Sequence, residues 1–276
     1  MLTSTRSGFH GVEIALEGSS SDPDLDLFLV HATGFCKELW RPVARPLLRE
    51  HASLAWLAMD QRGHGASGQG EPPYEWDLLG RDVLAVIGDG RARLGVGHSS
   101  GGAAIARAEI LRPGTFDGLV LIEPIIFPPP FGRRDIPLAT GAERRRANFP
   151  DRTTARQRFA DGPFATWEPE VLDLYIDHAF TDDRGGRSLR CNPQVEADFY
   201  REGANHDTWD GLSDIDAAVI LVVGEYSDSP TEPFVGLLRD RFRHADLVIV
   251  PGVGHLAPME APESIATIIG GALRDQ

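Results

Sequence analysis

The sequence is poor in cysteine and in lysine. Its 276 residues include two cysteines, Cys36 and Cys191, and a single lysine, Lys37. Two cysteines do not make a disulfide framework, and they lack the spacing of metal ligands, so neither a disulfide-rich secreted domain nor a cysteine metal site is indicated. There is also no run approaching about 18 apolar residues and no apolar segment at the N-terminus, so we expect a cytoplasmic protein without a membrane partner.

Net positive charge is lacking as well. The chain has 27 basic and 41 acidic residues, which gives a net charge of −14 at pH 7. A surface this negative repels phosphate backbones and anionic lipids, which argues against nucleic acid and against membrane binding. The 42% hydrophobic and 25% charged residues are ordinary for a globular protein, and the length suits one large α/β domain.

Strand-like apolar runs alternate with helix-like segments over most of the chain. This alternation predicts an α/β fold with a mostly parallel central sheet and helices on both faces. The expected strands are Val12–Leu16, Leu25–His31, Leu54–Met59, Ala92–Val96, Leu119–Ile122, Ala218–Val223 and Leu247–Val250. The expected helices are Lys37–Glu50, Leu78–Ile87, Ala103–Leu111, Pro233–Arg243 and Pro262–Arg274.

The alternation stops between residues 125 and 210. This segment is rich in proline, arginine and aromatic residues and contains two helix-like stretches, Pro169–Phe180 and one that opens at Asn192-Pro193 and closes at Gly203. A structureless loop of this length is improbable in a compact domain. We therefore expect residues 125–210 to form a helical cap, inserted in a core built from residues 1–124 and 211–276.

The most informative motif is Gly97-His98-Ser99-Ser100-Gly101, between an expected strand and an expected helix. In a Gly-x-Ser-x-Gly nucleophile elbow, a tight turn exposes a serine hydroxyl above the sheet. The turn brings neighbouring backbone so close that a Cβ at position 97 or 101 would clash. Ser99 is therefore the candidate nucleophile, and it needs an adjacent base.

Four motifs together resemble the α/β-hydrolase fold family, in particular its capped esterase-like members. They are His31-Ala32-Thr33-Gly34, Asp60–Ser67, the Ser99 elbow and Gly252-Val253-Gly254-His255, which span nearly the whole core. The resemblance implies a triad in the chain order serine, acid, histidine, and a serine in place of the aspartate of dehalogenase and epoxide hydrolase relatives. It also implies that Asp60–Ser67 is a turn scaffold in which Asp60 and Arg62 fix loops, against the alternative of a surface turn with unpaired charges.

The resemblance assigns the base and leaves two places for the acid. His255 follows the last expected strand, as the family's base does. Asp228, after the first strand beyond the cap, stands where the family usually places its acid. Glu123, after the strand that follows the elbow, is the alternative acid, and either carboxylate would orient the imidazole. The oxyanion hole would use the backbone N–H groups of Thr33 and Ser100, although this chain has His-Ala where the family often has His-Gly.

The substrate pocket is less well defined by the sequence. The candidates that could line it are mostly aromatic: Phe35, Trp40, Phe127, Phe131, Trp167, His206 and Trp209. Residues 133–158 contain eight arginines against three acids. This local excess could attract a carboxylate-bearing substrate, or it could be a solvated helix face.

These features predict a serine hydrolase that cleaves a small carboxylic ester through an acyl-serine and needs no metal or organic cofactor. Lactonase, C–C bond hydrolase and perhydrolase activities use the same triad and stay open. A hydrolase-fold ligand receptor with little turnover is an alternative from a different class.

Overall fold

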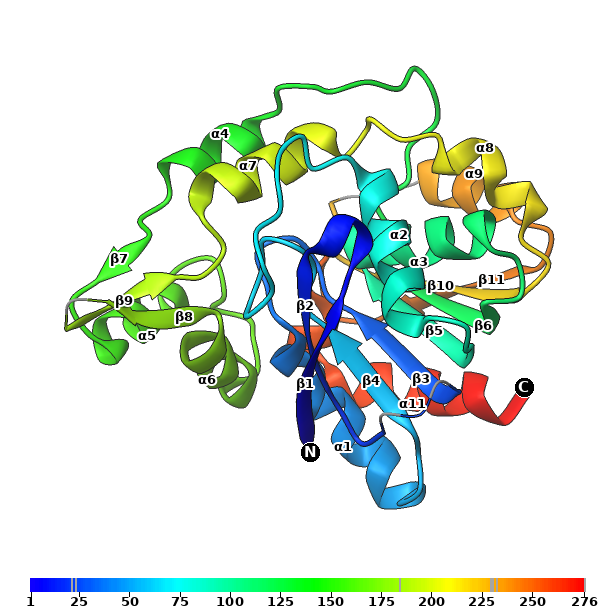
Figure 1. Ribbon diagram of the computed structural model, residues 1–276, viewed down its shortest axis with the longest axis horizontal. Coiled ribbons are helices and arrows are strands. Elements are labelled where there is room, and N and C mark those ends of the chain that lie inside the picture. The colour runs from blue at the N-terminus through cyan, green and yellow to red at the C-terminus, as the bar shows by residue number, and fades with distance from the viewer. Residues whose placement is uncertain (21, 23, 184, 229–230, 232, 276) are drawn as a thin grey trace.

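The computed structural model describes residues 1–20, 22, 24–183, 185–228, 231 and 233–275. Their main sheet has eight strands in the order β1-β2-β4-β3-β5-β6-β10-β11, with β1–β2 and β2–β4 antiparallel and the other pairs parallel (Figure 1). The strands are β1 (Leu2–Ser7), β2 (Glu13–Gly18), β3 (Leu25–Val30), β4 (Trp56–Met59), β5 (Ala92–His98), β6 (Phe116–Ile122), β10 (Ala218–Gly224) and β11 (Ala245–Val250).

Helices cover both faces of this sheet. Alternate residues of β3 point to opposite sides, so Phe28 enters one apolar core while Leu27 and Leu29 enter the other. The core around Phe28 is closed by α2 (Trp76–Ile87), α3 (Ser100–Leu111) and α9 (Phe234–Arg241), and the other core by α1 (Arg41–Glu50) and α11 (Pro262–Asp275). The predicted fold class, a mostly parallel sheet between two helical layers, is confirmed.

The N-terminal edge of the sheet differs from the expectation. The expected strand Val12–Leu16 corresponds to β2, which lies between β4 and β1, a strand that the sequence did not predict and that forms the edge. The sequence of β1, LTSTRS, is mostly polar and exposed, so it carries no apolar pattern by which to find it. The helix expected from Lys37 begins instead with a 3-10 turn, η2 (Lys37–Trp40), and becomes α1 at Arg41.

Residues between β6 and β10 form the inserted segment. They contain α4 (Pro137–Arg144), β7 (Asn148–Phe149), α5 (Arg152–Ala160), α6 (Pro169–His178), β8 (Phe180–Asp183), β9 (Gly186–Leu189), α7 (Pro193–Glu202) and α8 (Thr208–Gly211). In Figure 1, β7, β8, β9, α5 and α6 lie to one side of the main sheet. As the sequence predicted, α7 begins at a capping asparagine: the Asn192 side chain accepts a hydrogen bond from the Gln194 N–H at 2.8 Å.

The segment expected to form a helical cap contains strands as well as helices. The strands β7, β9 and β8 form an antiparallel three-stranded sheet, and α6 ends at His178, before Phe180 begins β8. The three strands have two to four residues each, and β8 and β9 are mostly polar. Strands this short have too few residues to show a period of two.

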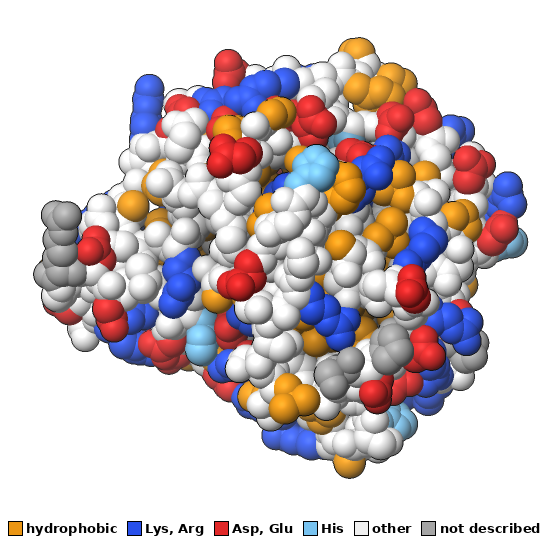
Figure 2. All heavy atoms as spheres, in the orientation of Figure 1, with side chains coloured by type: hydrophobic (Ala, Val, Ile, Leu, Met, Phe, Trp, Pro, Cys, Tyr) orange, Lys and Arg blue, Asp and Glu red, His pale blue; other side chains and the backbone are white. Residues whose placement is uncertain are grey.

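Four of the eight arginines of residues 133–158 form ion pairs with acidic side chains of the described residues. Arg133 pairs with Asp198 and Glu202, and Arg145 with Glu196, all on α7. Arg152 and Arg156 both pair with Asp173 on α6, and Arg152 also with Asp177. Figure 2 likewise shows basic and acidic side chains interspersed over the face that it presents. These pairings favour a structural use of the arginines over a free basic patch.

The turn between β4 and α2 contains a buried ion pair. Arg62 donates from Nε and Nη2 to the two carboxylate oxygens of Asp82 on α2, at 2.6 and 2.7 Å, and both side chains are buried. Asp60 is also buried and accepts the Ala66 N–H at 2.8 Å. The prediction that Asp60 and Arg62 fix loops agrees with these bonds, and a surface turn with unpaired charges is ruled out.

We expect Arg62→Met to destabilise the protein by about 3–5 kcal/mol, because it leaves the buried carboxylate of Asp82 unpaired. Urea unfolding measures the change. Arg243→Met is the matched control, since it breaks the exposed pair with Asp216 and should cost less than about 1 kcal/mol. Equal losses for the two variants would contradict the structural role of the Arg62–Asp82 pair.

Among the described residues, no helix is both long and apolar enough to cross a membrane.

Candidate active site

Ser99 lies in a strained turn between β5 and α3. Its backbone has φ 55° and ψ −114°, a conformation that costs energy for a residue with a side chain. A Cβ on Gly97 would lie 2.3 Å from the Gly101 carbonyl oxygen, and one on Gly101 would lie 2.3 Å from the Val30 carbonyl oxygen. The two glycines therefore permit the close approach that the motif predicted, and the turn is the geometry of a nucleophile elbow.

The loop after β3 lies against the start of α3. The Gln61 side-chain amide donates to the His31 carbonyl at 2.6 Å and to the Ser100 hydroxyl at 3.0 Å, so it ties the two segments together. Ser100 begins α3, where the first backbone N–H groups have no partner within the helix. Among the described residues, the Thr33 N–H donates to no backbone carbonyl. The two predicted oxyanion donors thus come from adjoining segments, and neither N–H is used in a β ladder.

The imidazole of His255 lies beside a buried carboxylate, that of Glu123. His255 is in the loop between β11 and α10 (Ala257–Glu260), and its Nδ1 is 3.3 Å from Glu123 Oε2. Glu123 directly follows β6, is fully buried and has φ 51°. Its carboxylate also accepts the Gly224 N–H and the Ser227 hydroxyl, each at 2.6 Å. A carboxylate at Nδ1 of an imidazole is the arrangement that fixes the tautomer of a catalytic base.

Asp228 lies in the turn where the sequence placed it, but no contact among the described residues joins its carboxylate to His255. The expected acid lies in the turn after β10 with its side chain exposed. The carboxylate paired with His255 is instead that of Glu123, the alternative. The turn after β10 does reach the pair, but through Ser227, one residue before Asp228, whose hydroxyl contacts Glu123. The backbone of Glu123 accounts for this pairing. It has a left-handed conformation in the turn after β6, and from there the carboxylate contacts both Gly224, at the end of β10, and His255.

His98 links the elbow to the His255 loop. Its Nε2 lies 2.8 Å from the His255 carbonyl oxygen, and the two rings are 5.4 Å apart. Burial, reinforced by the positive charge of a protonated His255, lowers the pKa of His98 to about 3, so the ring is neutral and Nε2 carries the proton that it donates. The sequence gave His98 no role, yet its side chain bonds the backbone of His255 to the strand end beside Ser99.

Two further histidines near the elbow are structural. His31 donates from Nδ1 to the Ala32 carbonyl at 2.7 Å and accepts the Gln61 N–H at Nε2, and burial lowers its pKa to about 4. His64 donates from Nδ1 to the Arg62 carbonyl, and burial lowers its pKa to about 3. Both rings are neutral and already bonded, so both histidines have structural roles.

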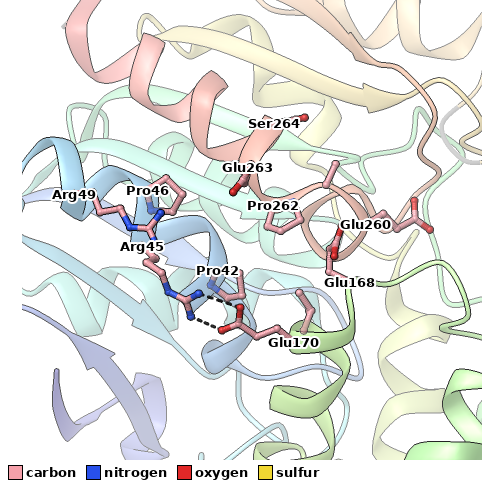
Figure 3. Close-up of a pocket in the computed structure, with 12 residues that line it drawn as sticks. Pro42, Arg45, Pro46, Arg49, Glu168, Glu170, Glu260, Pro262, Glu263 and Ser264 are labelled. Carbon is pink, nitrogen blue, oxygen red and sulfur yellow. Dashed lines mark hydrogen bonds and ion pairs between the residues drawn. The ribbon is translucent and has the colours of Figure 1, made fainter.

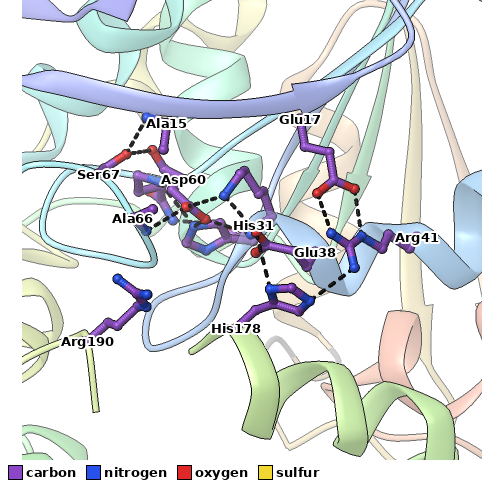
Figure 4. A network of polar contacts seen from close by, with 12 residues as sticks. Ala15, Glu17, His31, Glu38, Arg41, Asp60, Ala66, Ser67, His178 and Arg190 are labelled. Atoms are coloured by element: carbon purple, nitrogen blue, oxygen red, sulfur yellow. Dashed lines mark hydrogen bonds and ion pairs between the residues drawn. The ribbon is translucent and has the colours of Figure 1, made fainter. Parts of the chain in front are cut away.

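Figure 4 shows a buried polar network around Asp60 and Glu38, to which the single lysine, Lys37, belongs. Lys37 donates from Nζ to Asp60 and Glu38, both at 2.8 Å. Burial works against the charged form, but the carboxylates of Asp60 and Glu38 outweigh it and raise the pKa of Lys37. The network continues to His178 of α6, whose Nδ1 is 3.7 Å from Glu38 Oε1 and whose Nε2 accepts from Arg41. This chain of contacts fastens the inserted segment to the core beside the loop that carries Thr33.

The predicted pocket residues separate into groups. Phe35 and Trp167 lie together, with ring centroids 5.3 Å apart, and Phe35 also stacks above His98. Both belong to one apolar cluster that joins the loop after β3 to the inserted segment. Because Phe35 follows the proposed oxyanion donor by two residues, this pair remains the best-placed of the candidates for a substrate pocket.

A second aromatic group gathers around Phe234 of α9, a residue that the sequence reading missed. Phe127 and Trp209 lie 5.8 and 5.9 Å from it, ring to ring. The backbone leading to Phe127 is tied to the elbow, because the Ile125 N–H donates to the Ser99 carbonyl at 3.3 Å. Phe131 is half-buried in the segment that precedes α4.

The remaining two candidates have other surroundings. Trp40 is buried in the core between the sheet, α1 and α11, on the opposite face of the sheet from α3, so its prediction as a pocket residue was wrong. His206 stacks on Trp76 at 5.1 Å, and its ring nitrogens bond to the Thr208 hydroxyl and the Gly203 carbonyl. Burial lowers its pKa to about 4, so it serves as a neutral packing residue.

One cleft of about 460 Å³ opens away from these residues, between α1, α6 and α11 (Figure 3). Its walls carry prolines and charged side chains, and Arg45 spans it to pair with Glu170. None of the candidate site residues lines it. Within the described part of the chain, no three histidine, cysteine, aspartate or glutamate side chains gather in a way that could hold a metal ion.

Comparison with known proteins adds to this geometry. A family model described as the alpha/beta hydrolase family matches residues 27–268. The chain belongs to this family. The alpha/beta hydrolases similar to it in sequence include the abhydrolase domain-containing protein ACTT2 of Alternaria alternata, 27% identical over 64% of this chain and 80% of that protein. The type I acyl-CoA thioesterase mpaH of Penicillium brevicompactum is 29% identical over 70% of this chain and 47% of that protein.

Among solved structures, the peroxisomal alpha-beta-hydrolase Lpx1 of Saccharomyces cerevisiae superposes with a TM-score of 0.81. It is 19% identical, and the match covers 99% of this chain and 87% of that one. At this identity the likeness shows the fold, an alpha/beta hydrolase over nearly the whole chain. It does not transfer a substrate.

Proposed function

We propose that this alpha/beta hydrolase is a serine hydrolase that cleaves a small carboxylic ester through an acyl-serine, with Ser99, His255 and Glu123 as its triad. The observation that carries the proposal is the strained Ser99 turn, joined through His98 to the loop of an imidazole that is itself paired with a buried carboxylate. A serine hydroxyl is a weak nucleophile until a base removes its proton. The bond from His98, the residue before Ser99, to the His255 carbonyl supports His255 as that base. Glu123 replaces Asp228 as the proposed acid.

The proposed chemistry follows from these positions. The Ser99 hydroxyl oxygen attacks the ester carbonyl carbon while His255 Nε2 takes the hydroxyl proton, and the imidazolium is stabilised by Glu123 at Nδ1. Negative charge on the former carbonyl oxygen is received by the Thr33 and Ser100 N–H groups. The carbon–oxygen bond to the alcohol then breaks, and His255 returns the proton to the alcohol. A water molecule then attacks the acyl carbon while His255 takes its proton. The bond to the Ser99 oxygen breaks, His255 returns the proton to that oxygen, and the carboxylic acid is released.

The apolar surroundings support an acyl group of low polarity. Phe35 and Trp167 lie in the apolar cluster beside the loop of Thr33. Phe127 follows Ile125, whose N–H donates to the Ser99 carbonyl. A thioester is a second candidate substrate class, because the mpaH relative is an acyl-CoA thioesterase and a thioester carbonyl undergoes the same attack. Both substrates use the same residues and differ in the leaving group.

Labelling with a fluorophosphonate tests the proposal. We expect wild-type protein to hydrolyse short p-nitrophenyl esters and to carry the label on Ser99, as mapped by mass spectrometry, because the label requires an activated serine. Labelling of Ser99 with hydrolysis of acyl-CoA alone would select the thioester. A folded protein with neither label nor turnover would refute the enzyme and favour the ligand receptor.

A further inference from the structure

The turn after β10, residues Gly224–Ser227, holds the Glu123 carboxylate on both oxygens. The Gly224 N–H donates to Oε1 and the Ser227 hydroxyl donates to Oε2, each at 2.6 Å. Oε2 is also the oxygen that lies 3.3 Å from His255 Nδ1. One carboxylate oxygen is therefore shared between the Ser227 hydroxyl and the imidazole of the proposed base.

The position of Ser227 is fixed from both sides. Its N–H donates to the Gly224 carbonyl at 3.0 Å, and the preceding Tyr226 N–H donates to the Val253 carbonyl at 2.8 Å, two residues before His255. The backbone of Glu123 is bonded to β10, the strand that precedes this turn, since the Glu123 N–H donates to the Val222 carbonyl at 2.8 Å. The turn thus contacts the acid through Ser227 and the loop of the base through Tyr226.

We propose that Ser227 is a positioning residue for the acid: its hydroxyl orients the Glu123 carboxylate toward His255 and limits how strongly that carboxylate binds the imidazolium. The inference rests on the proposed triad. The turn after β10 is the place from which the sequence predicted the acid itself. Here it supplies instead the hydrogen bond that holds an acid from the end of β6.

The direction of the hydrogen bond determines its effect. An ionised carboxylate only accepts, so the Ser227 hydroxyl donates and withdraws negative charge from Oε2. Without the hydroxyl, more of the negative charge on Oε2 would act on His255 and favour the imidazolium. The free enzyme would then lose its base at a higher pH than the wild type does.

Among the described residues, the neighbouring titratable side chains are neutral, exposed or bonded elsewhere. His98, on β5, is neutral and donates to the His255 carbonyl. The carboxylates of Glu225 and Glu260 accept the backbone N–H groups of Gly252 and Gly254, and Asp228 is exposed. The Ser227 hydroxyl is thus the described side chain that shares Glu123 Oε2 with the base.

Three variants test the proposal through the pH profile of kcat/KM for a p-nitrophenyl ester. We expect Ser227→Ala to lower kcat/KM roughly ten-fold and to move its acidic limb to higher pH, since it removes a hydrogen bond to a charged group. Ser227→Thr keeps the hydroxyl and should restore both properties. Tyr226→Phe removes a hydroxyl from the adjacent, 70% exposed side chain and should match the wild type.

Thermal melting of each variant separates loss of fold from loss of positioning. An acidic limb unchanged in a folded Ser227→Ala variant would overturn the proposal, as would a folded Ser227→Thr variant that behaves like Ser227→Ala. If one of these contradicting results is found while the fluorophosphonate still labels Ser99, only the proposed role of Ser227 fails and the proposed function stands. If wild-type Ser99 is not labelled, the proposed function fails first, and this inference fails with it.

Discussion

Ser99→Ala should lower kcat for ester hydrolysis by at least about 10⁴-fold, because no acyl-enzyme can form without the hydroxyl. In serine hydrolases of other folds, loss of the nucleophile alone removes about as much activity as loss of the whole triad. Residual turnover would come from the oxyanion donors and from substrate binding, which the variant retains. Stopped or continuous p-nitrophenol release, measured with saturating ester, gives kcat directly.

The control for Ser99→Ala is Ser264→Ala. Ser264 lies in the cleft of Figure 3, between α1, α6 and α11, and its loss should change kcat by no more than about two-fold. Its variant also tests the cleft as a rival active site. Retained turnover in Ser99→Ala together with its loss in Ser264→Ala would place the chemistry in that cleft and contradict the proposed triad.

The fold could be predicted because its signals are local and repeated. Each central strand is mostly apolar, since both faces of the sheet are buried, and most of these strands are followed by a helix. The elbow could be predicted for a related reason. A Cβ at position 97 or 101 would lie less than 2.5 Å from backbone atoms, so the turn requires glycine at both positions. The strand β1 and the small sheet of β7, β9 and β8 escaped prediction because their polar residues gain order from a partner strand rather than from burial.

The acid could not be settled from the sequence because two turns meet at one point. Glu123 ends β6 and Asp228 follows β10, and these strands are neighbours in the sheet. Either carboxylate stands at the correct end of the sheet, so chain position alone does not distinguish them. The distinction comes from a backbone torsion, the φ of 51° at Glu123, and from a hydrogen bond given by Ser227. Neither leaves a pattern in the sequence.

The aromatic candidates illustrate a similar limit. Phe35 and Trp40 are five residues apart, but Phe35 meets the inserted segment while Trp40 enters the core on the other face of the sheet. The 3-10 turn η2 between them redirects the chain, and the sequence had suggested a continuous helix there. Because the sequence did not predict this 3-10 turn, Trp40 was assigned to the substrate pocket, whereas its side chain lies in the core on the other face of the sheet.

Glu123→Gln should lower kcat by about 10³–10⁴-fold, whereas Asp228→Asn should leave it within about two-fold. The side-chain amide that replaces the Glu123 carboxylate could not satisfy both neighbours. If the amide oxygen took the place of Oε1, the NH₂ group would face His255 Nδ1 and the Ser227 hydroxyl. If it took the place of Oε2, the NH₂ group would oppose the Gly224 N–H. Either arrangement disturbs the imidazole tautomer or the turn, and neither supplies the negative charge that stabilises the imidazolium.

The pair of variants decides between the two acids in one experiment. Both remove a single charge and keep the shape of the side chain, so a difference in kcat reports the site rather than the substitution. Melting temperatures exclude unfolding, and fluorophosphonate labelling of Ser99 should slow in Glu123→Gln because the base is no longer oriented. The reverse pattern, a silent Glu123→Gln and an inactive Asp228→Asn, would return the acid to the turn after β10. It would also require that turn to rearrange when substrate binds, since Asp228 is exposed in this structure.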